Sequence, residues 1–595
     1  MKSAFSTPSN RILGFILALT ILVFIQTLSF DFAGFDDMLL ITRNPTAQGL
    51  SLQNITAAFT TYDPELYVPI TLLSYQVEHS IAGLSPWIYH LTNLVIHLLC
   101  TVLVFIVFRK LARFCVSKND AYYVAGFVAL MFALHPLNVQ TVAWAAARKD
   151  SLSTLFALLS IALFLQYKES NHKKLWYWSI GFFALGLAAK VSIVLLPFIL
   201  LLASKMHLEK SDRRSLVPFI PYFALSGIFG LIALGGKQQQ LSTLTLTDTI
   251  LLGAKSMYFY VQNLFTPGHL ALFYHHTGEI TLLKPTFYFP MIIILLMIIL
   301  AAVSYKRQRH ITFGILFFFL LLLPTFFNFW KNGFIDIASD RYAYLALSGL
   351  TFSIGIILIP HLKYRRTAGV ILGVVLAGSS FIQTRIWSDG ETLLRATLRN
   401  YPDSTHALMN LGVTMHEKGN SESALALYDQ AIALDPNLAP AYLNKARVVA
   451  KTGDIKEAII LTKKSISVIS SDRITTPDEL QAFFFLGVMY EQVGELEKAF
   501  LAFSDATAYA PESSVAFFNL GVMFQKYSHP KEARDAFNKA YALEPKGLEN
   551  RYRLAAVEAE LGNLPFAILH LEYILKKDPH YEQAAKHLKA LRSSR

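Results

Sequence analysis

The sequence contains little cysteine and little charge. Only 2 of its 595 residues are cysteines, Cys100 and Cys115, and both lie in or beside one apolar run. This scarcity excludes a disulfide framework and leaves no zinc-binding pattern. Charged residues make up 16% of the chain and hydrophobic residues 54%, whereas an ordinary soluble protein carries roughly 25% charged residues. Much of the chain is therefore expected to lie in lipid.

The long apolar runs are confined almost entirely to residues 1–385, while residues 400–595 have the composition of a soluble helical domain. A membrane-spanning helix needs about 20 apolar residues. Eleven such spans are predicted, beginning near residues 11, 87, 121, 151, 175, 191, 216, 286, 311, 341 and 366. The first is interpreted as an anchor, because it lacks a small-residue cleavage site and further spans follow it.

One apolar stretch is predicted not to span. Residues 250–265 are apolar but short, and they carry Lys255 and Gln262. A run of this length with two polar side chains is typical of an interfacial or re-entrant helix. We expect this helix on the outer side of the membrane.

Cationic loops indicate the orientation, because short loops rich in Lys and Arg stay in the cytoplasm. With eleven spans, these loops all fall on one side, together with Lys2 and Arg11. Their residues are Arg109, Lys110, Arg113, Lys118, Lys168, Lys173, Lys174, Lys205, Lys210, Arg213, Arg214, Lys306, Arg307, Arg309, Lys363, Arg365 and Arg366. The N-terminus is therefore predicted to be cytoplasmic and the C-terminal domain to lie outside. The net charge of +12 clusters in these loops, which argues against nucleic-acid binding.

Two adjacent carboxylates, Asp36 and Asp37, follow the first apolar run and are predicted to lie at the outer membrane surface. Unpaired charge is expensive there, so such residues usually serve a purpose. The alternative interpretation is a solvated pair of charges at a helix end. Adjacent side chains in an extended loop point in opposite directions, so the two carboxylates are not both expected to face one ligand.

A few cations fall on the predicted outer side, against the general bias. They are Arg43, Arg148, Lys149, Lys190, Lys331, Arg341 and Arg385. Snorkelling or a local ion pair explains any single one of them equally well. Several together, on the face that also carries the aspartates, favour a bound anion such as a phosphate. Arginine offers phosphate a planar fork and lysine a point charge.

The C-terminal third repeats with a period of 34 residues, so that Leu486 and Gly487 recur as Leu520 and Gly521. Small residues, an aromatic residue and a terminating proline recur around each such pair. These positions are Ala424, Ala431, Ala499, Ala506, Ala533, Ala540, Tyr428, Phe503, Phe537, Pro436, Pro511 and Pro545. This is the tetratricopeptide pattern, and we predict five repeats and a polar capping helix over 580–591. The concave face of such a solenoid typically binds an extended peptide.

The sequence thus predicts an all-α protein with two domains. A polytopic membrane helix bundle over residues 1–385, whose outer loop over 31–85 carries the aspartate pair, precedes a linker over 386–404. The tetratricopeptide α-solenoid follows over residues 405–595. We expect an integral membrane protein of a bacterial inner membrane, with a cytoplasmic N-terminus and periplasmic repeats. A protein of the endoplasmic reticulum would look alike.

Several segments of the membrane half, taken in order, resemble one known family. They are Phe35-Asp36-Asp37 with Asn44-Pro45; Pro69-Ile70-Thr71-Leu72-Leu73-Ser74; His90-Leu91-Thr92-Asn93 with His97; Ala133-Leu134-His135-Pro136 running to Val142-Ala143-Trp144 and Arg148-Lys149-Asp150-Ser151-Leu152-Ser153; Ala189-Lys190; Asp340-Arg341-Tyr342-Ala343-Tyr344; and Trp387-Ser388-Asp389. In this order and with these spans, the chain resembles the O-mannosyltransferases that combine transmembrane helices with tetratricopeptide repeats, and their bacterial relatives. The likeness covers nearly the whole chain.

The resemblance implies a membrane glycosyltransferase of the C type. Such an enzyme moves a sugar, here expected to be mannose, from a polyprenyl-phosphate donor to a Ser or Thr hydroxyl of a protein, with inversion, on the outer face. By this resemblance Asp36 is the general base, and Asp37 is its neighbour or a metal contact. Because a sugar phosphate brings its own good leaving group, one carboxylate suffices to take the hydroxyl proton. Stabilising the departing phosphate is then work for cations.

The candidate ligands of the donor phosphate are Arg148, Lys149, Lys190 and Arg341. His135 either bonds the phosphate or braces the end of a span. Supporting roles are assigned to Asp150, Asp340, Tyr342, His90 and Asn93. No cofactor is identified beyond the donor substrate, and a divalent metal ion remains open. The expected partners are the lipid-linked sugar donor, an acceptor polypeptide on the repeats and membrane lipids.

The chain departs from the family at four positions. Gln140 stands where relatives commonly carry an acidic residue, and Asn138 stands where a His is frequent. Val68 and Val191 occupy positions at which a bulkier polar residue or a proline is common. The lost carboxylate at position 140 weakens any metal-bridging role, and it is compatible with a different sugar or an altered mechanism.

Two other functions were weighed against the enzyme. A non-catalytic membrane scaffold, whose repeats recruit envelope or secretion partners, explains the repeats but leaves Asp36, Lys190 and Arg341 without a task. A lipid-linked sugar flippase predicts paired charges deep in the spans and internal symmetry between two halves. The sequence has neither feature, and the enzyme accounts for the aspartates, the cations and the repeats together.

Overall fold

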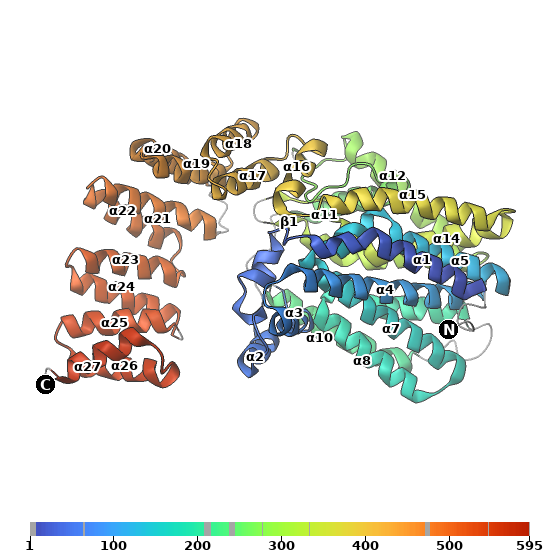
Figure 1. Ribbon diagram of the computed structural model, residues 1–595, viewed down its shortest axis with the longest axis horizontal. Coiled ribbons are helices and arrows are strands. Elements are labelled where there is room, and N and C mark those ends of the chain that lie inside the picture. Colours follow the sequence, from blue (N-terminus) through green and yellow to red (C-terminus); the bar gives the residue numbers. More distant parts are fainter. Residues whose placement is uncertain are drawn as a thin grey trace. The chain divides into compact units, whose positions relative to one another are not determined.

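The chain divides into two compact units, Met1–Ser404 and Thr405–Arg595, in the computed structural model shown in Figure 1. The structure describes residues 8–62, 66–207, 216–236, 244–276, 278–331, 334–469, 477–545 and 547–593. Four residues of the cationic set, Lys2, Lys210, Arg213 and Arg214, lie outside these ranges.

The first unit consists almost entirely of helices. They are α1 (Pro8–Phe24), α2 (Leu52–Thr60), α3 (Pro69–Ala82), α4 (Pro86–Ala112), α5 (Lys118–Leu134), α6 (Val139–Ala143), α7 (Arg148–Ser170), α8 (Lys173–Ala189), α9 (Leu196–His207), α10 (Ile220–Gly236), α11 (Leu246–Phe265), α12 (Pro285–Ser304), α13 (Arg309–Leu322), α14 (Ala343–Leu358), α15 (Arg365–Arg385) and α16 (Gly390–Asn400). A short strand β1 (Trp330–Lys331) pairs antiparallel with β2 (Phe334–Ile335). The segment predicted as a linker contains α16, and Asn400 at its end donates to the Leu270 carbonyl at 3.0 Å.

Eight helical stretches in the described part of the chain are long and apolar enough to cross a membrane. They are Asn10–Ser29, Pro86–Ala112, Ala145–Ser170, Val217–Gly236, Pro285–Ser304, Arg309–Phe326, Asp340–His361 and Arg365–Arg385. A ninth results if Lys118–Leu134 and Pro136–Ala143, which meet at 54°, form one span. The spans predicted near 175 and 191 correspond to α8 and to Val191–Met206, which are shorter. Every predicted span therefore falls on a helix of this unit.

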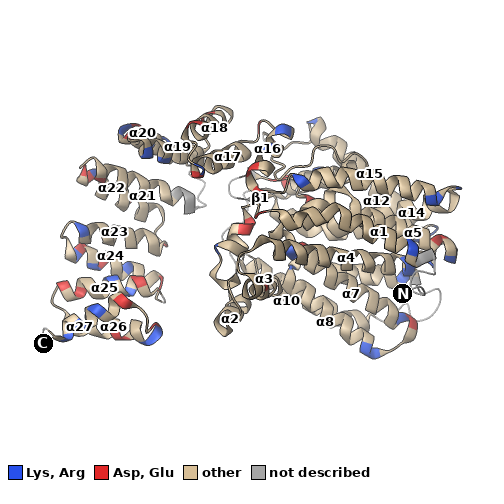
Figure 2. Cartoon of the chain, viewed as in Figure 1, with Lys and Arg blue, Asp and Glu red and all other residues tan. Residues whose placement is uncertain are grey.

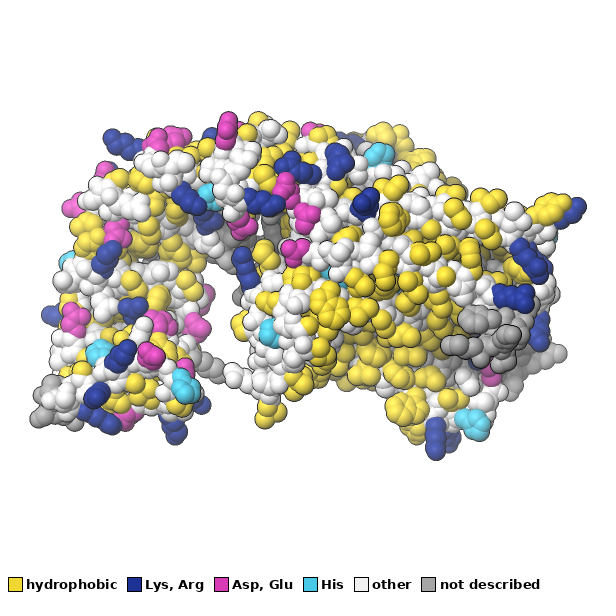
Figure 3. Space-filling view, viewed as in Figure 1, with side chains coloured by type: hydrophobic (Ala, Val, Ile, Leu, Met, Phe, Trp, Pro, Cys, Tyr) yellow, Lys and Arg dark blue, Asp and Glu magenta, His cyan; other side chains and the backbone are white. Residues whose placement is uncertain are grey.

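The surface of the first unit agrees with a membrane location. Its charged residues are sparse along the helices and gather towards their ends, whereas charge is spread over the helices of the second unit (Figure 2). Hydrophobic side chains cover much of the visible flank (Figure 3). The exposed hydrophobic side chains of this unit include Leu231, Ile292 and Val375. An apolar surface of this extent is unfavourable in water and favourable in lipid. The first unit is an integral membrane bundle, as predicted.

The helix that follows the first cationic loop is broken before it reaches the end of the bundle. Helix α5 ends at Leu134 because Pro136 has no N–H to donate. The Asn138 side chain donates instead to the freed Phe132 carbonyl, at 2.7 Å. The chain then continues through α6 into α7, so residues 139–150 lie together at one end of the bundle.

Helices α13 and α14 cross closely at two glycines. A Cβ atom on Gly314 or on Gly349 would collide with the backbone carbonyl of the other residue. Small residues at a crossing allow membrane helices to approach and to gain dispersion contacts. This contact holds α14, whose first turn follows the Asp340–Tyr342 segment of the site described below.

The stretch predicted to be interfacial or re-entrant lies in α11, which is not among the membrane-length apolar helices of the described residues. The helix begins with a capping box, in which Thr245 and Asp248 each accept the other's backbone N–H. Its other end is held by His135, whose Nε2 lies 3.1 Å from the Leu264 carbonyl oxygen. The helix is therefore fixed to the polar end of the bundle.

The second unit contains five helix pairs and a final helix among its described residues. They are α17 (Thr405–Glu417) and α18 (Ser421–Leu434), α19 (Ala439–Thr452) and α20 (Ile455–Val468), α21 (Pro477–Gln492) and α22 (Leu496–Tyr509), α23 (Ser514–Lys526) and α24 (Pro530–Leu543), α25 (Leu548–Glu560) and α26 (Leu564–Lys577), and α27 (Glu582–Ser593). The recurring glycines face recurring rings, because a Cβ atom on Gly412, Gly487 or Gly521 would lie under 3.0 Å from the ring of Tyr428, Phe503 or Phe537. The predicted tetratricopeptide solenoid is confirmed.

Candidate active site at one end of the membrane unit

The aspartate pair lies on a tight turn that follows α1. Gly34 and Phe35 both have positive φ, at 84° and 56°. Such a left-handed turn reverses the chain within two residues, and the Asp37 N–H closes it by donating to the Gly34 carbonyl at 3.0 Å. The turn directs the two carboxylates into different surroundings, as expected for adjacent residues.

Asp37 is fully buried and joins two backbone segments. Its Oδ2 accepts the Ala33 N–H and its Oδ1 accepts the Ala146 N–H, both at 2.8 Å. Burial raises the pKa of Asp37 to about 7, although the two backbone N–H bonds oppose that shift. Both oxygens are committed to the backbone, so of the two roles predicted for Asp37, neighbour of the base or metal contact, the geometry favours the first. Asp37 ties the loop that follows α1 to the segment that precedes α7.

Asp36 is the accessible carboxylate of the pair. Its side chain is 32% exposed, and its Oδ2 lies 2.8 Å from Nζ of Lys149, which is itself 4% exposed. Lys149 is on the first turn of α7, three residues after the Ala146 N–H that binds Asp37. The neighbouring aspartate therefore also fixes the distance between Asp36 and its lysine.

Asp150 is the centre of a second group of charges. Its Oδ1 accepts from Lys190 Nζ at 2.5 Å, and its Oδ2 lies 3.9 Å from Arg341 Nε. Lys190 lies between α8 and α9, and burial lowers the pKa of its ammonium, opposed by the Asp150 carboxylate. Three cations and two carboxylates from four segments of the chain thus converge beside Asp36.

Aromatic rings and one amide hold the two cations that face Asp150. The Tyr342 ring lies 5.2 Å from Lys190 Nζ and 5.4 Å from the Arg341 guanidinium, which also lies 5.0 Å from the Trp144 ring. Gln140 Oε1 accepts the Arg341 N–H at 2.8 Å and the Ser339 hydroxyl at 3.2 Å. Gln140, one of the four positions at which the family resemblance predicts another residue, therefore supports the segment that carries Arg341.

An apolar cavity of about 340 Å³ opens beside these cations. Among its described lining residues Lys190 is the only charged one, and Tyr342 also lines it. The remaining lining residues are Leu66, Tyr67, Val68, Leu187, Val191, Ser192, Val194, Leu195, Phe229, Gly230, Ala233, Leu234, Leu323, Pro324, Thr325 and Asn328. Two of the four departures from the family, Val68 and Val191, are thus in the wall of this cavity.

The described residues contain no group of three or more His, Cys, Asp or Glu side chains placed to hold a metal ion. Gln140 is neutral and Asp37 is committed to backbone donors.

Two family models match the chain. Residues 78–235 match the model of dolichyl-phosphate-mannose-protein mannosyltransferases. Residues 375–439 and 417–466 match the model of the tetratricopeptide repeat. The first match contains Lys149, Asp150 and Lys190, and it leaves Asp36 and Arg341 outside.

Several curated proteins are similar to the chain. A protein O-mannosyl-transferase of Caenorhabditis elegans is 23% identical over 451 residues, which is 71% of this chain and 62% of the relative. TMTC4 of Mus musculus, also a protein O-mannosyl-transferase, is 24% identical over 432 residues, 61% of this chain and 57% of its own. TMTC2 of the same species is 32% identical over 130 residues, 22% of this chain and 14% of its own.

The chain is similar in sequence to the TMTC protein O-mannosyl-transferases. This confirms the family resemblance predicted from the sequence. The chain spans about three fifths of the length of the first two relatives, 62% and 57%. Among solved structures, YrrB, a tetratricopeptide-repeat protein, is 19% identical with a TM-score of 0.26, over 33% of this chain and 97% of its own.

Arg148, expected to bind the donor phosphate in this TMTC-like chain, belongs to a separate buried cluster. Its guanidinium is fully buried and pairs with Glu78, and its Nε donates to Asn93 Oδ1 at 2.8 Å. It also lies 4.7 Å from the Tyr75 ring and donates to the Tyr89 carbonyl at 2.6 Å. This geometry corrects the expectation that Arg148 binds the donor phosphate, because its N–H groups already bind residues of α3 and α4. Asn93 supports that cluster and not the Asp36 group.

The other predicted residues are also structural. His135 is buried, binds the Leu264 carbonyl through Nε2 and accepts the Leu137 N–H on Nδ1 at 3.3 Å, so it braces a helix end and is not placed to bond phosphate. Asp340 is buried and accepts from the Tyr274 hydroxyl at 2.7 Å. His90 is buried in α4, with its ring 6.3 Å from that of Phe30.

Sequence reasoning missed three residues of this end of the bundle. Glu78 and Tyr75 enclose Arg148, and Gln140 was noted only as an absent carboxylate. A signal existed for Glu78, because a lone acidic residue in the apolar run after Pro69 calls for a partner. No sequence signal distinguishes Arg148 from its neighbour Lys149.

Proposed function

We propose that the protein is an inverting membrane glycosyltransferase. It transfers a sugar, with mannose as the expected one, from a polyprenyl-phosphate donor to a Ser or Thr hydroxyl of a protein. The observation that carries the proposal is the accessible Asp36 carboxylate paired with Lys149, in one group of charges with Arg341 and with Lys190, which lines an apolar cavity. The relatives, named protein O-mannosyl-transferases, support the same reaction.

The cavity suits the lipid of the donor. A polyprenyl chain is apolar and its phosphate is anionic. The cavity of about 340 Å³ matches both, because its wall is apolar and Lys190 lines it. The phosphate would take Lys190 and Arg341 as partners, sharing them with Asp150. Cations held in place before the reaction stabilise charge that develops on a leaving group, which here is the departing phosphate.

Asp36 has the position of the general base. It takes the proton of the acceptor hydroxyl while that oxygen attacks the anomeric carbon, and the bond from that carbon to the phosphate oxygen breaks with its electron pair. One displacement of this kind inverts the anomeric centre. Lys149 orients the carboxylate at 2.8 Å, and a positioned base of this kind contributes about 10²–10⁴-fold in rate.

The orientation proposed for the site is the outer face, which in a bacterium is the periplasmic side of the inner membrane. Helix α7 carries Lys149 in its first turn and Glu169 in its last, where Lys110 of the cationic set pairs with it at 2.7 Å. At 1.5 Å per residue, these ends lie about 30 Å apart, which is the thickness of the hydrocarbon layer. The positive-inside bias then assigns the Asp36 end to the outside.

The repeats supply a place for the acceptor. Tetratricopeptide solenoids present an extended concave surface, and we propose that the second unit binds the acceptor polypeptide there. This part of the proposal is independent of the donor site, because removing the repeats would weaken acceptor use and leave donor binding intact.

The test is sugar transfer in vitro by the full chain. Wild type and Asp36→Asn are purified in detergent and given polyprenyl-phosphate mannose with candidate acceptor peptides, and labelled product is counted. Asp31→Asn is the matched control, since Asp31 is an exposed aspartate of the same loop that caps the Phe32 N–H. Transfer by wild type and the control, with a loss of about 10²–10⁴-fold in Asp36→Asn, supports the proposal. No transfer by any of the three, with several lipid-linked sugars, overturns it and favours a membrane scaffold.

A further inference from the structure

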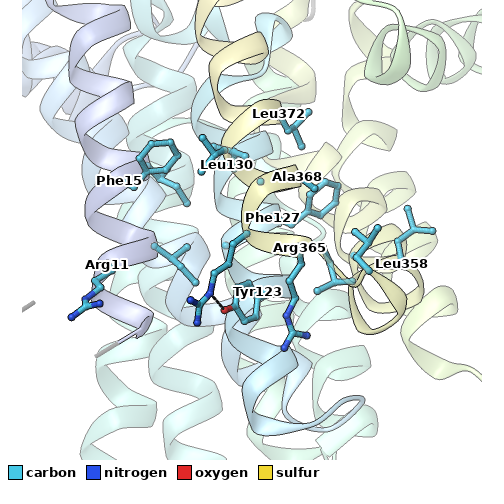
Figure 4. Close-up of a pocket in the computed structure, with 18 residues that line it drawn as sticks. Arg11, Phe15, Tyr123, Phe127, Leu130, Leu358, Arg365, Ala368 and Leu372 are labelled. Carbon is cyan, nitrogen blue, oxygen red and sulfur yellow. Dashed lines mark hydrogen bonds between the residues drawn. The ribbon is translucent and has the colours of Figure 1, made fainter. Parts of the chain in front are cut away.

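Figure 4 shows a second cavity, of about 380 Å³. It lies beside the first half of α1, whereas Asp36 follows the other end of that helix. Its walls come from α1, α5, α14 with the turn that follows it, and α15. These helices and the turn after α14 carry Arg11, Lys118, Lys363, Arg365 and Arg366 of the cationic set, and none of the residues that line this cavity has a role in the proposed reaction.

Three arginines lie at one end of this cavity. Arg365 pairs with Asp120 and lies 4.2 Å from the Tyr123 ring, while Arg366 donates through Nε to the Tyr123 hydroxyl at 2.8 Å. Arg11 reaches the same end from α1, and Figure 4 shows it across the cavity mouth from Arg365. Among the described residues that line this cavity or pair with its arginines, three guanidinium groups face one carboxylate, that of Asp120, so positive charge is in excess there.

The remainder of the cavity is apolar and open to the side. Ile12, Phe127, Leu130 and Leu372 line it away from the arginines, and Phe15, also in the wall, is 37% exposed. Gly369 contributes open space, because a Cβ atom built on it would meet nothing within 4 Å. The cavity is therefore an apolar groove that faces the hydrocarbon of the bilayer.

The arginines lie at the level of lipid headgroups. Arg365 is the first residue of a membrane-length helix, and Arg11 is the second residue of another, Asn10–Ser29. A side chain at the end of a span reaches the interface where phosphates lie. Arginine binds phosphate with paired N–H donors and at fixed geometry.

We propose that this groove binds one anionic glycerophospholipid. Its phosphate lies against Arg11 and Arg366, and its acyl chains follow the apolar wall between α1 and α15. The excess positive charge selects an anionic headgroup over a zwitterionic one. The proposal does not depend on the transfer reaction, because the groove and the Asp36 site are at opposite ends of the bundle.

Native mass spectrometry of the delipidated full chain in detergent tests this. Dioleoyl phosphatidylglycerol and dioleoyl phosphatidylcholine are titrated separately, and the occupancy of a first bound lipid is measured. Each arginine near an anionic lipid contributes about fivefold in affinity. We expect phosphatidylglycerol to bind more tightly, Arg366→Gln to weaken it about fivefold and Arg11→Gln with Arg366→Gln about 25-fold, with phosphatidylcholine little changed.

A second variant tests the groove itself. Gly369→Phe fills the apolar space and is expected to abolish the first bound lipid of either type. Gly378→Phe is its matched control, since Gly378 lies in the same helix, has nothing within 4 Å of a built Cβ atom and does not line the cavity. Equal affinity for the two lipids in the wild type, or wild-type binding by Gly369→Phe, overturns the proposal. Loss of binding by Gly378→Phe as well overturns the assignment to this groove.

Discussion

The side-chain carbonyl of Gln140 accepts the backbone N–H of Arg341 at 2.8 Å, across 201 residues of sequence. It also accepts the Ser339 hydroxyl, so one neutral amide positions the chain just ahead of α14. An acidic residue, which the family resemblance leads us to expect at this position, could accept the same two bonds. In this chain the support carries no charge.

Gln140→Leu is expected to reduce both stability and donor use. The Arg341 N–H and the Ser339 hydroxyl would lose their acceptor in a buried place, which costs about 1–3 kcal/mol of the free energy of unfolding. Because Arg341 shifts, KM for the donor rises. Gln140→Glu keeps both bonds and is expected to retain the fold. Thermal unfolding and transfer kinetics measure the two effects, with exposed Gln262→Leu as control. Unchanged KM in Gln140→Leu would contradict the positioning role.

Asp37→Asn is expected to lower stability by about 1–3 kcal/mol, because an amide can accept only one of the two backbone N–H groups that Asp37 binds. The deficit should depend on pH. Since burial raises the pKa of Asp37 from 3.8 to about 7, the folded wild type holds a proton that the unfolded chain has lost over that interval. The wild type therefore loses stability as the pH rises from about 4 to 7.

Melting temperatures of wild type and Asp37→Asn at pH 5 and pH 8 check this. The advantage of the wild type should be larger at pH 5 and smaller at pH 8. An advantage that grows with pH would mean that the two backbone N–H groups outweigh burial and keep the carboxylate charged.

Replacing Arg148 by Met is expected to destabilise the bundle by about 3–5 kcal/mol, because Glu78 would remain as a buried charge without its partner. Replacing both residues, Arg148→Met with Glu78→Leu, should recover much of that loss. Lys149→Met is the matched comparison, one position along the same helix. It should leave the melting temperature close to that of the wild type and reduce transfer, since Lys149 faces Asp36. If the double variant loses more transfer activity than its loss of folded protein explains, Arg148 would have a role in the donor site.

Gly230→Phe is expected to obstruct the cavity beside Lys190. A Cβ atom on Gly230 meets nothing within 4 Å, so the ring enters the space and not a neighbour. We expect the ring to take the place of about two methylene groups of the lipid. Each lost burial costs about 0.8 kcal/mol of binding free energy, so KM for the donor rises about tenfold. Gly227→Phe is the control, because Gly227 lies one turn away with the same open surroundings and does not line the cavity. Equal KM values for the two variants would remove the donor from this cavity.

Transfer is expected to persist in EDTA. The reason is the set of side chains: Asp37 spends both oxygens on backbone N–H groups, Gln140 is neutral and Asp150 pairs with Lys190, so among the described residues no second carboxylate is placed to share a metal ion with Asp36. The measurement compares rates with EDTA and after readdition of Mg²⁺ or Mn²⁺. Activity that disappears with EDTA and returns with either ion would contradict this expectation.

The architecture was accessible from sequence because its signals are local and repeated. Span length follows from apolar runs such as 12–30, and the solenoid follows from a 34-residue spacing of glycine and aromatic residues. These patterns depend only on the distance along the chain. The spans and the repeats were therefore predicted. Helices α8 and α9, also predicted as spans, are shorter than the other membrane-length helices of the described residues.

The partners of the charged residues were not accessible in the same way. Arg148 and Lys149 are adjacent, and in a helix adjacent side chains point about 100° apart. One therefore faces Glu78 on α3 and the other faces Asp36 after α1, and that difference is decided by where α3 and the first loop pack. The same applies to His135 and Asp340, whose partners lie 129 and 66 residues away.

The two hydrogen bonds of Asp37 also have a consequence for motion. They join the loop that carries Asp36 to the backbone just ahead of Lys149. The proposed base and its counter-ion therefore belong to one rigid piece of the structure. In the proposed reaction a bulky lipid-linked sugar enters beside this piece, and we expect the piece to move as a whole if the helix ends spread to admit it. The wall of the cavity can widen while the spacing of acid and amine stays constant.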